Sequence, residues 1–252
     1  DSPISVKTNK VNVEVKMDNM GLLYSQTNPA HPAQDVAFTI SNLTIPAKKN
    51  IDIPTANPFK CYLYPPAFDK EKLPIPFLLP PGGSNLMNIV SMMPKLKEEL
   101  RTIFNDYGLK YVFDTNSQEI KVMKEKKPGE IFLIPFHSIA DTLQRMIFYK
   151  AAIESNSESA LVFEEPEAHS YPPFISKVTQ DIIQSDRNQF FITTHSPYVV
   201  NDFLELPSDE LAIYLVDFRN GETFVKRASD TEIQEMYEYG IDLFFNTETF
   251  LR

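Results

Sequence analysis

The sequence predicts an α/β protein with a parallel sheet and flanking helices, preceded by an antiparallel β-rich region. Two short, mostly apolar runs, residues 159–163 and 189–192, are each followed by polar, ionisable residues, and a helix-length segment separates them. Apolar runs of this length and spacing are typical of neighbouring buried strands in a parallel sheet. The first 80 residues are rich in proline and short of helix signals. We therefore predict two regions, 1–80 and 81–252.

The composition excludes several classes of protein. The 252 residues are 42% apolar and 23% charged, as in globular proteins. No apolar run approaches the ~18 residues of a membrane-spanning helix, and the first residues do not resemble a signal peptide. A single cysteine, Cys61, excludes an internal disulfide and is typical of a cytoplasmic protein. A net charge of -10 argues against a broad nucleic-acid-binding face on this chain.

The first region contains two candidate strands and many prolines. Residues 11–17 alternate apolar and polar side chains, as a half-buried strand does, and residues 35–43 form a second candidate. Prolines between residues 54 and 81 then interrupt short extended pieces such as residues 60–64. We interpret this region as an antiparallel sheet with long loops and without chemistry of its own.

A long helix is predicted at the start of the second region. Residues 82–84 read Gly-Gly-Ser, a turn whose serine is suited to cap a helix. Apolar side chains then recur at helical spacing over residues 86–104, and Gly108 is placed to end the helix. Pro94 lies inside this stretch and is expected to kink the helix or to split it.

The turn at residues 82–84 is not a phosphate-binding loop. That loop needs two glycines separated by four residues and followed by Lys and Ser or Thr, so that backbone N–H groups and the lysine surround the phosphates. No such pattern occurs in the 252 residues.

A β-hairpin and a further strand follow. Residues 110–114 and 119–124 are predicted to pair across a turn, and residues 131–134 form another strand. Four lysines on this hairpin favour a solvated strand edge, with a DNA contact as the alternative: Lys121, Lys124, Lys126 and Lys127.

A helix is predicted from about residue 139 onward. Ser138, followed three residues later by Asp141, matches the pattern of a capping box. The helix carries one apolar stripe, made of Ile139, Leu143, Met146, Ile147 and Ala151.

The remaining elements are predicted from local signals. A helix with prolines in its first turn covers residues 172–182, and another begins at Ser196-Pro197 and runs to residue 203. Residues 211–217 and 222–227 flank an Asn-Gly pair, which is a strong hairpin signal. A last helix is predicted over residues 231–239.

The candidate site lies where the two parallel strands end. Glu164 and Glu165 follow the first strand directly, and His195 follows the second. In open α/β sheets, ligands bind outside the carboxyl ends of the strands. We therefore expect these three side chains to meet at one edge of the sheet.

These residues also carry a resemblance to a known family. Residues 164–169 read EEPEAH and resemble the Walker B segment of ABC-type ATPases, especially a prokaryotic branch similar to SMC proteins and to the ATPase half of OLD-type nucleases. Residues 194–197 read THSP and resemble the switch-histidine loop of that family. The order of the two motifs and the single helix between them also match. The resemblance implies a partial ABC-ATPase-like P-loop NTPase sheet over about residues 80–252.

The resemblance also implies roles for four residues. Glu164 stands in the position of the residue that holds Mg²⁺ through water, and Glu165 in that of the catalytic glutamate that polarises the attacking water. His195 matches the switch histidine that senses the γ-phosphate. Ser138 matches the signature-motif serine, which contacts ATP held by the opposite subunit. At residues 139–140 the sequence reads Ile-Ala, where the family usually carries glycine.

The function implied is that of an ATP-binding and ATP-hydrolysing subunit that uses ATP and Mg²⁺. It would act as a head-to-tail homodimer through the ATP site, in the cytoplasm, with a partner protein or DNA bound through the full-length protein. Because Walker A precedes these motifs in the family, the chain is expected to be a portion without it and to bind ATP weakly or not at all.

Two alternatives remain open. The first is a non-hydrolysing protein-interaction module that inherited the ATPase fold. The second is metal-dependent hydrolysis carried out directly by the acidic and histidine side chains of the two motifs: Glu164, Glu165, Glu167, His169 and His195.

Overall fold

The computed structural model describes residues 4–7, 12–18, 21–27, 36–40, 58–65, 75–117, 119–207, 209–240 and 243–250. The chain divides into two compact units, residues Asp1–Thr55 and Ala56–Arg252, which are considered separately. This division falls before the boundary at residue 80 that the sequence suggests. None of the described helices combines the length and the apolar character that crossing a membrane requires.

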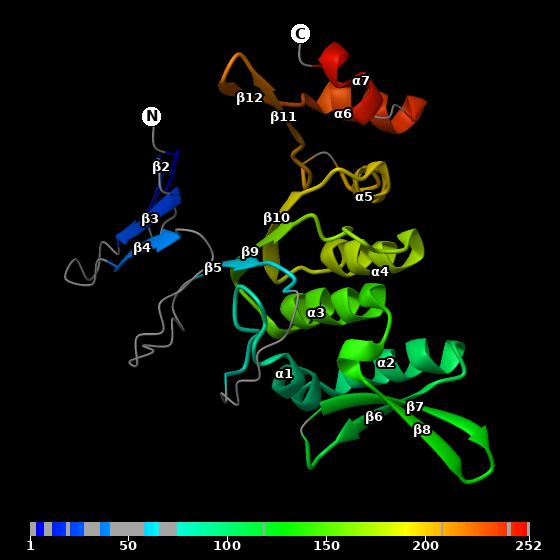
Figure 1. The fold of residues 1–252 in the computed structure, drawn as a ribbon. Coiled ribbons are helices and arrows are strands. Elements are labelled where there is room, and N and C mark those ends of the chain that lie inside the picture. Colours follow the sequence, from blue (N-terminus) through cyan, green and yellow to red (C-terminus); the bar gives the residue numbers. More distant parts are fainter. Residues whose placement is uncertain are drawn as a thin grey trace. The chain divides into compact units, whose positions relative to one another are not determined.

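The first unit contains an antiparallel sheet of four strands. Strands β1 (Ile4–Lys7), β2 (Asn12–Asp18), β3 (Gly21–Thr27) and β4 (Val36–Ile40) are hydrogen-bonded in sequence order (Figure 1). Neighbouring strands pair antiparallel throughout. The strands predicted at residues 11–17 and 35–43 correspond to β2 and β4 and are confirmed.

The second unit is built on a parallel sheet. Its strands are β5 (Phe59–Tyr62), β9 (Ser159–Glu164) and β10 (Asn188–Thr193), in the order β10-β9-β5. Strand β9 lies in the middle and pairs in parallel with both neighbours. The predicted α/β class with a parallel sheet and an antiparallel region is confirmed.

The placement of residues 60–64 in the antiparallel region is wrong. Strand β5 joins the parallel sheet, where Cys61 lies opposite Val162 and Tyr62 opposite Phe163. Tyr62 is fully buried, and its hydroxyl donates to the Leu78 carbonyl at 2.6 Å. The partner strand lies about a hundred residues away in the chain, so the flanking prolines gave no local sign of the parallel pairing.

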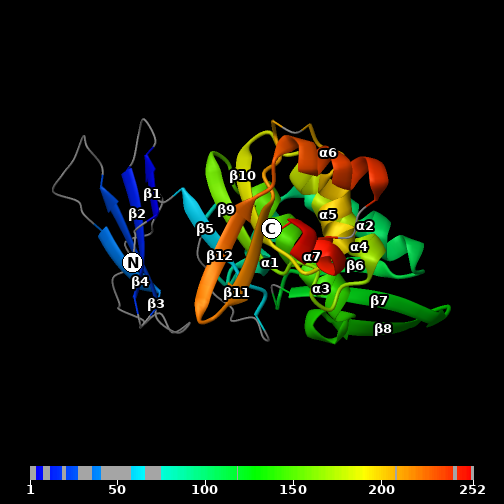
Figure 2. The ribbon, with the colours of Figure 1, turned by 90° about the horizontal axis from the view of Figure 1, so that it is seen from above.

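Five helices pack beside this sheet. They are α1 (Leu86–Met92), α2 (Pro94–Asp106), α3 (Asp141–Ser155), α4 (Pro172–Ile183) and α5 (Pro197–Phe203). Figures 1 and 2 show α3 and α4 side by side on one side of β9 and β10. The predicted split at Pro94 is confirmed, because this proline opens α2, where a missing N–H costs no hydrogen bond.

The predicted cap at Ser84 is wrong. The residue at the start of α1 is Asn85, and its side chain makes no cap hydrogen bond. The Asn85 amide is instead buried and bridges the chain before the helix, accepting from the Leu79 N–H at 2.8 Å and donating to the Phe77 carbonyl at 2.9 Å.

Helix α3 runs through the centre of the main core. Consecutive side chains along it are buried, including Tyr149 and Phe148 on neighbouring positions. Its apolar surface is therefore broader than the single stripe that helical spacing suggests. Phe163 of β9 packs against the Tyr149 ring, with ring centroids 5.1 Å apart. Helix α3 therefore supports the strand that ends at Glu164.

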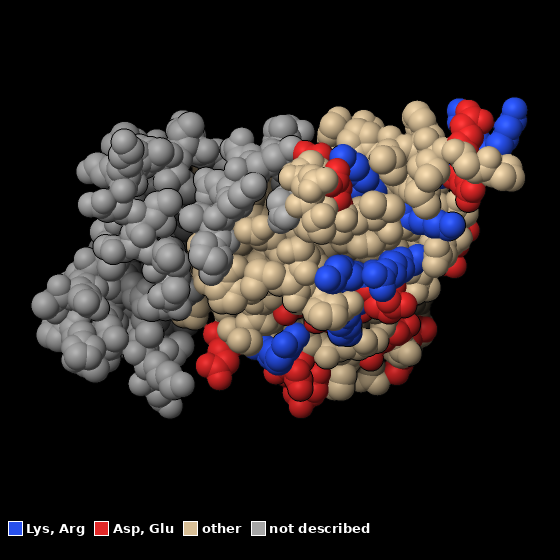
Figure 3. All heavy atoms as spheres, turned by 90° about the horizontal axis from the view of Figure 1, so that it is seen from below, with Lys and Arg blue, Asp and Glu red and all other residues tan. Residues whose placement is uncertain are grey.

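An antiparallel sheet precedes α3. Strands β6 (Lys110–Asp114), β7 (Glu119–Lys127) and β8 (Glu130–Pro135) pair in that order, which confirms the predicted hairpin and strand. The lysines at the far end of β7 are exposed. On the face drawn in Figure 3, Lys and Arg side chains lie beside Asp and Glu side chains rather than forming a broad basic area.

The C-terminal elements form a second apolar cluster. Strands β11 (Tyr214–Arg219) and β12 (Glu222–Arg227) pair across Asn220 and Gly221, both at positive φ, as the predicted hairpin requires. Helix α6 (Asp230–Tyr239) begins with a capping box, and α7 (Leu243–Phe250) was not predicted.

Gly83 allows the chain to pass tightly over α3. Its φ is +67°, and a Cβ there would lie 2.8 Å from the Phe148 ring. Gly129 has a φ of +83° with open space around it, so it shares the backbone constraint without the clash. We expect Gly83→Ala to lower the free energy of unfolding by about 1–3 kcal/mol more than Gly129→Ala does. Urea denaturation of both variants would measure the difference, and equal losses would contradict it.

Candidate functional site

The ends of β9 and β10 bring Glu165 and His195 together. Glu164 and Thr193 are partners in the last register position of the two strands. The Glu165 N–H then donates to the Thr193 carbonyl at 2.9 Å and extends the ladder by one residue. Beyond it, the His195 Nε2 lies 3.0 Å from the Glu165 Oε1. The expected meeting of these two side chains at one edge of the sheet is observed.

The Glu165–His195 pair lies open to solvent. The His195 side chain is 81% exposed and the Glu165 side chain 45% exposed. Ion pairs this exposed contribute roughly 0–1 kcal/mol to stability. The pair therefore does little to hold the fold, whereas water can reach both groups.

The loop after β9 adopts an uncommon backbone conformation. Glu165 has a φ of +41° and His169 a φ of +55°. Such values cost about 1–2 kcal/mol for residues other than glycine. Turn hydrogen bonds hold the loop, from the Ala168 N–H to the Glu165 carbonyl at 3.0 Å and from the Ser170 N–H to the Glu167 carbonyl at 2.8 Å. Strain of this kind gathers at functional sites.

Glu167 joins the loop after β9 to the loop after β10. Its Oε1 accepts from the Thr194 hydroxyl at 2.6 Å and from the His195 N–H at 2.8 Å. The Thr194 Oγ1 in turn accepts from the Ser196 N–H at 3.0 Å. The second carboxylate oxygen, Oε2, is buried and has no hydrogen-bond partner among the described residues.

Glu164 is exposed at the end of β9. Burial raises the pKa of the Cys61 thiol, and the Glu164 carboxylate adds a smaller rise. The thiol is therefore protonated near neutral pH and is unsuited to act as a nucleophile.

Among the described residues, no group of three His, Cys, Asp or Glu side chains could hold a metal ion. The alternative of metal-dependent hydrolysis through direct ligands has no support in the structure.

Ser138 does not cap α3. It ends a short 3₁₀ turn, Phe136–Ser138, and is exposed. Ile139, in extended backbone, and Ala140 separate it from the helix, and the residue at the cap position is Ala140, which has no side-chain cap hydrogen bond. The predicted capping box with Asp141 is wrong, because the spacing pattern does not register these two residues.

The first turn of α3 is tied to the loop after β9. The Thr142 hydroxyl donates to the His169 carbonyl at 3.0 Å. The segment that carries Ser138 is thus connected through two hydrogen-bonded loops to His195. The described residues show no direct contact between Ser138 and the Glu165–His195 pair.

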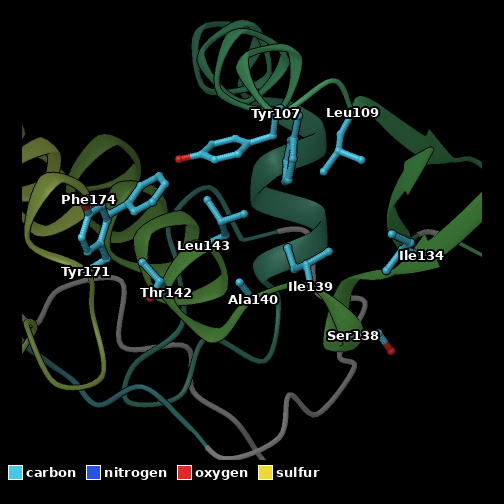
Figure 4. A pocket seen from close by; sticks show the side chains of 11 residues that line it. Tyr107, Leu109, Ile134, Ser138, Ile139, Ala140, Thr142, Leu143, Tyr171 and Phe174 are labelled. Atoms are coloured by element: carbon cyan, nitrogen blue, oxygen red, sulfur yellow. The ribbon is translucent and has the colours of Figure 1, made fainter. Parts of the chain in front are cut away.

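A pocket opens beside the first turn of α3. It has a volume of about 460 Å³ and an apolar wall, and the Tyr107 and Phe174 rings stack there with centroids 6.1 Å apart. In Figure 4 the Ser138 hydroxyl points away from the other labelled side chains, so Ser138 marks the rim of the pocket. The lining residues are Phe104, Tyr107, Leu109, Ile134, Ser138, Ile139, Ala140, Thr142, Leu143, Tyr171 and Phe174.

Sequence reasoning missed Glu167 as a linking residue. The EEPEAH motif drew attention to it, but only the fold places its carboxylate beside the start of the loop after β10. A carboxylate two residues after Glu165, together with a Thr-His pair after the next strand, is a signal that could have suggested the contact.

Several solved structures are similar to this chain at low identity. One is described as "Structural biochemistry of ATP-driven dimerization and DNA stimulated activation of SMC ATPases": it shares 15% identity over 61% of this chain and 96% of that chain, with a TM-score of 0.41. The SMC head domain from Thermotoga maritima shares 9% identity, and the match covers 87% of this chain and 74% of that chain, with a TM-score of 0.38. An SmcHead bound to the C-winged helix domain of ScpA shares 14% identity, and the match covers 86% of this chain and 69% of that chain, with a TM-score of 0.41.

The comparison by family gives a direct assignment. A search of the curated proteins finds no match to the sequence. One family profile matches residues 73–201, a span of 129 residues and so just over half of the 252. The matched span contains α1 to α4, both motif strands and His195. The chain belongs to the family described as "AAA domain, putative AbiEii toxin, Type IV TA system".

Proposed function

We propose that this chain supplies part of an ATP-hydrolysing site, namely the residues at the carboxyl ends of β9 and β10. The observation that carries the proposal is the Glu165–His195 pair, 3.0 Å apart at the ends of two parallel strands. Membership of an AAA-domain family supports an ATPase fold. The strained backbone at Glu165 supports a role beyond stability, because the exposed pair contributes little to folding.

In the proposed reaction, Glu165 orients a water molecule and accepts its proton. The water oxygen bonds to the γ-phosphorus of ATP while the bond to the bridging oxygen of ADP breaks. His195, held against Glu165, contacts the γ-phosphate and makes the carboxylate's position depend on that phosphate. Proton transfer by a positioned side chain typically contributes about 10²–10⁴-fold to a rate.

Glu164 fits a hydrated magnesium ion better than a directly bound one. Its carboxylate is exposed at the end of β9, and the described residues offer no group of three acidic or histidine ligands. Magnesium is often held by one or two carboxylates and keeps several waters. The ion, when bound, would neutralise charge on the phosphate oxygens.

The phosphate-binding loop of the site would come from outside these 252 residues. They contain no phosphate-loop pattern, so we propose that the chain alone binds ATP weakly and is inactive by itself. In the described sheet, β10 is paired on one side only, so its other edge presents unpaired backbone N–H and C=O groups. A strand leading into a phosphate loop would fit this edge.

Ser138 is proposed to act across a dimer. It is exposed and makes no described contact with the Glu165–His195 pair, as suits a residue that meets ATP held by a second subunit in a head-to-tail homodimer. Ser138 lies outside α3. The positive end of the helix dipole, at the free backbone N–H groups of the first turn of α3, would therefore attract the phosphate without a cap at Ser138.

The test compares the chain with the full product of its gene. The gene product, tagged and purified with whatever co-purifies, is expected to hydrolyse ATP, while the 252-residue chain shows no turnover and weak binding of labelled ATP. If neither sample binds or hydrolyses ATP, the enzyme proposal is lost. That result would favour the second candidate, a non-hydrolysing interaction module, which the missing phosphate loop already suits.

A further inference from the structure

We propose that Glu167 is a positioning residue that fixes His195 against Glu165. The proposal rests on the proposed function only for what the His195–Glu165 pair does, because the positioning itself is a property of the folded chain. The resemblance to the ATPase family implies no role for Glu167. Its contacts with the residues after β10 point to a positioning role.

The Glu167 carboxylate holds the segment that follows β10. One oxygen, Oε1, accepts both the Thr194 hydroxyl and the His195 N–H, at 2.6 and 2.8 Å. Both donors belong to the two residues that follow β10. The backbone of His195 is therefore held by a charge-assisted hydrogen bond, which is about twice as strong as a neutral one.

No polar contact of the His195 ring other than that with Glu165 occurs among the described residues. The side chain is 81% exposed, and its one described polar contact is with the Glu165 carboxylate. An exposed ring can change rotamer, so the position of its backbone decides whether one of its rotamers reaches the Glu165 carboxylate. The Glu167 contact restricts the backbone at the point from which the ring projects.

The Glu167 contact has a cost in stability. The Glu167 Oε2 is buried without a partner among the described residues, although the Oε1 of the same carboxylate accepts two donors. A buried polar atom without a partner lowers the stability of the fold, because it has lost its hydrogen bonds to water. An apolar contact between the two loops would avoid this cost, so the carboxylate is better explained by the position it gives His195 than by stability.

The experiment uses NMR on the 252-residue chain without nucleotide. It follows hydrogen exchange of the His195 backbone amide and the ¹⁵N shift of the His195 Nε2, with Glu165→Gln as the reference for a weakened ring contact. We expect Glu167→Ala to speed amide exchange by about tenfold or more, the factor that matches loss of one hydrogen bond of about 1.4 kcal/mol. The Nε2 signal should move toward that of Glu165→Gln.

Three further variants separate positioning from general structure. Glu167→Gln keeps an oxygen acceptor but loses the charge, so both measurements should fall between those of the parent chain and those of Glu167→Ala. Thr194→Val removes one donor at nearly constant shape and should shift the same signals, whereas Thr194→Ser should not. Thr142→Val breaks the other hydrogen bond of this loop, to the His169 carbonyl, and should leave the His195 signals unchanged.

The outcomes decide the proposal in either direction. If Glu167→Ala fails to fold, the Thr194→Val and Thr194→Ser pair gives the answer. Unchanged His195 exchange and Nε2 shift in folded Glu167→Ala and Thr194→Val would overturn the proposal. Because no nucleotide is present, this result is independent of whether the assembly hydrolyses ATP.

Discussion

Replacing Glu165 by glutamine is expected to lower ATP turnover by the assembled protein by about 10²–10⁴-fold, the usual contribution of a positioned general base. The amide has the same shape and can still contact His195, but it cannot accept a proton from water. Affinity for ATP should be retained, because the change removes no group that binds the nucleotide. Steady-state turnover and labelled-ATP binding of the purified full gene product would measure both.

The matched control for this variant is Glu158→Gln. Glu158 is also an exposed glutamate with a positive φ of 49°, but it precedes β9 and so lies at the opposite end of the same strand. Its replacement should leave turnover unchanged. Equal turnover in the Glu165→Gln variant and the parent protein would remove Glu165 from the mechanism.

Replacing Lys150 by methionine is expected to lower the free energy of unfolding by about 3–5 kcal/mol, the usual effect of breaking a buried ion pair. Lys150 of α3 is 5% exposed. Its ammonium donates to the Glu99 Oε2 of α2 at 2.9 Å and also to the Asp181 carboxylate of α4. The variant would leave two carboxylates close together without their cation.

The pH dependence of this variant provides a second measurement. Burial raises the pKa of Asp181, and Lys150 is the group that opposes this rise. A carboxyl group with a higher pKa in the folded state favours folding at low pH, and this contribution is lost as the pH rises above the ordinary value of 3.8. The loss caused by Lys150→Met should therefore be smaller at pH 4 than at pH 7.

Two comparisons test the explanation by buried charge. Lys95 pairs with Glu154 at 2.7 Å, but its side chain is 71% exposed, so Lys95→Met should cost no more than about 1 kcal/mol. Adding Glu99→Gln and Asp181→Asn to Lys150→Met should recover part of the loss, because no unpaired charge remains. Equal losses for Lys150→Met and Lys95→Met, in urea denaturation at pH 7, would contradict the account.

Much of the fold could be predicted because its signals are local. The two motif strands are short apolar runs, Pro94 opens a helix, and the Asn-Gly pair at 220 and 221 turns a hairpin. The parallel pairing of β5 could not be predicted, since it depends on a strand about a hundred residues away. Helix α7 has a weakly patterned sequence with few helix signals, and its Leu243 and Phe250 belong to the second apolar cluster, whose other members come from several elements.

The site divides in the same way. The meeting of Glu165 and His195 followed from the rule that parallel strands present their carboxyl ends at one edge. The role of Glu167 did not follow, because two loops must first be placed before its carboxylate reaches Thr194 and His195. Spacing alone predicts Ser138 as a cap, because it cannot show that Ile139 and Ala140 separate this serine from the helix.

A double-mutant cycle on Glu165 and His195 tests most directly whether the two side chains act as one unit on ATP. Turnover of the assembled protein would be measured for Glu165→Gln, His195→Ala and the double variant. Groups that act as a unit show strongly non-additive effects, so we expect the double variant to be about as slow as the slower single variant. Effects that multiply would show that the two side chains act independently, which would contradict the proposed site.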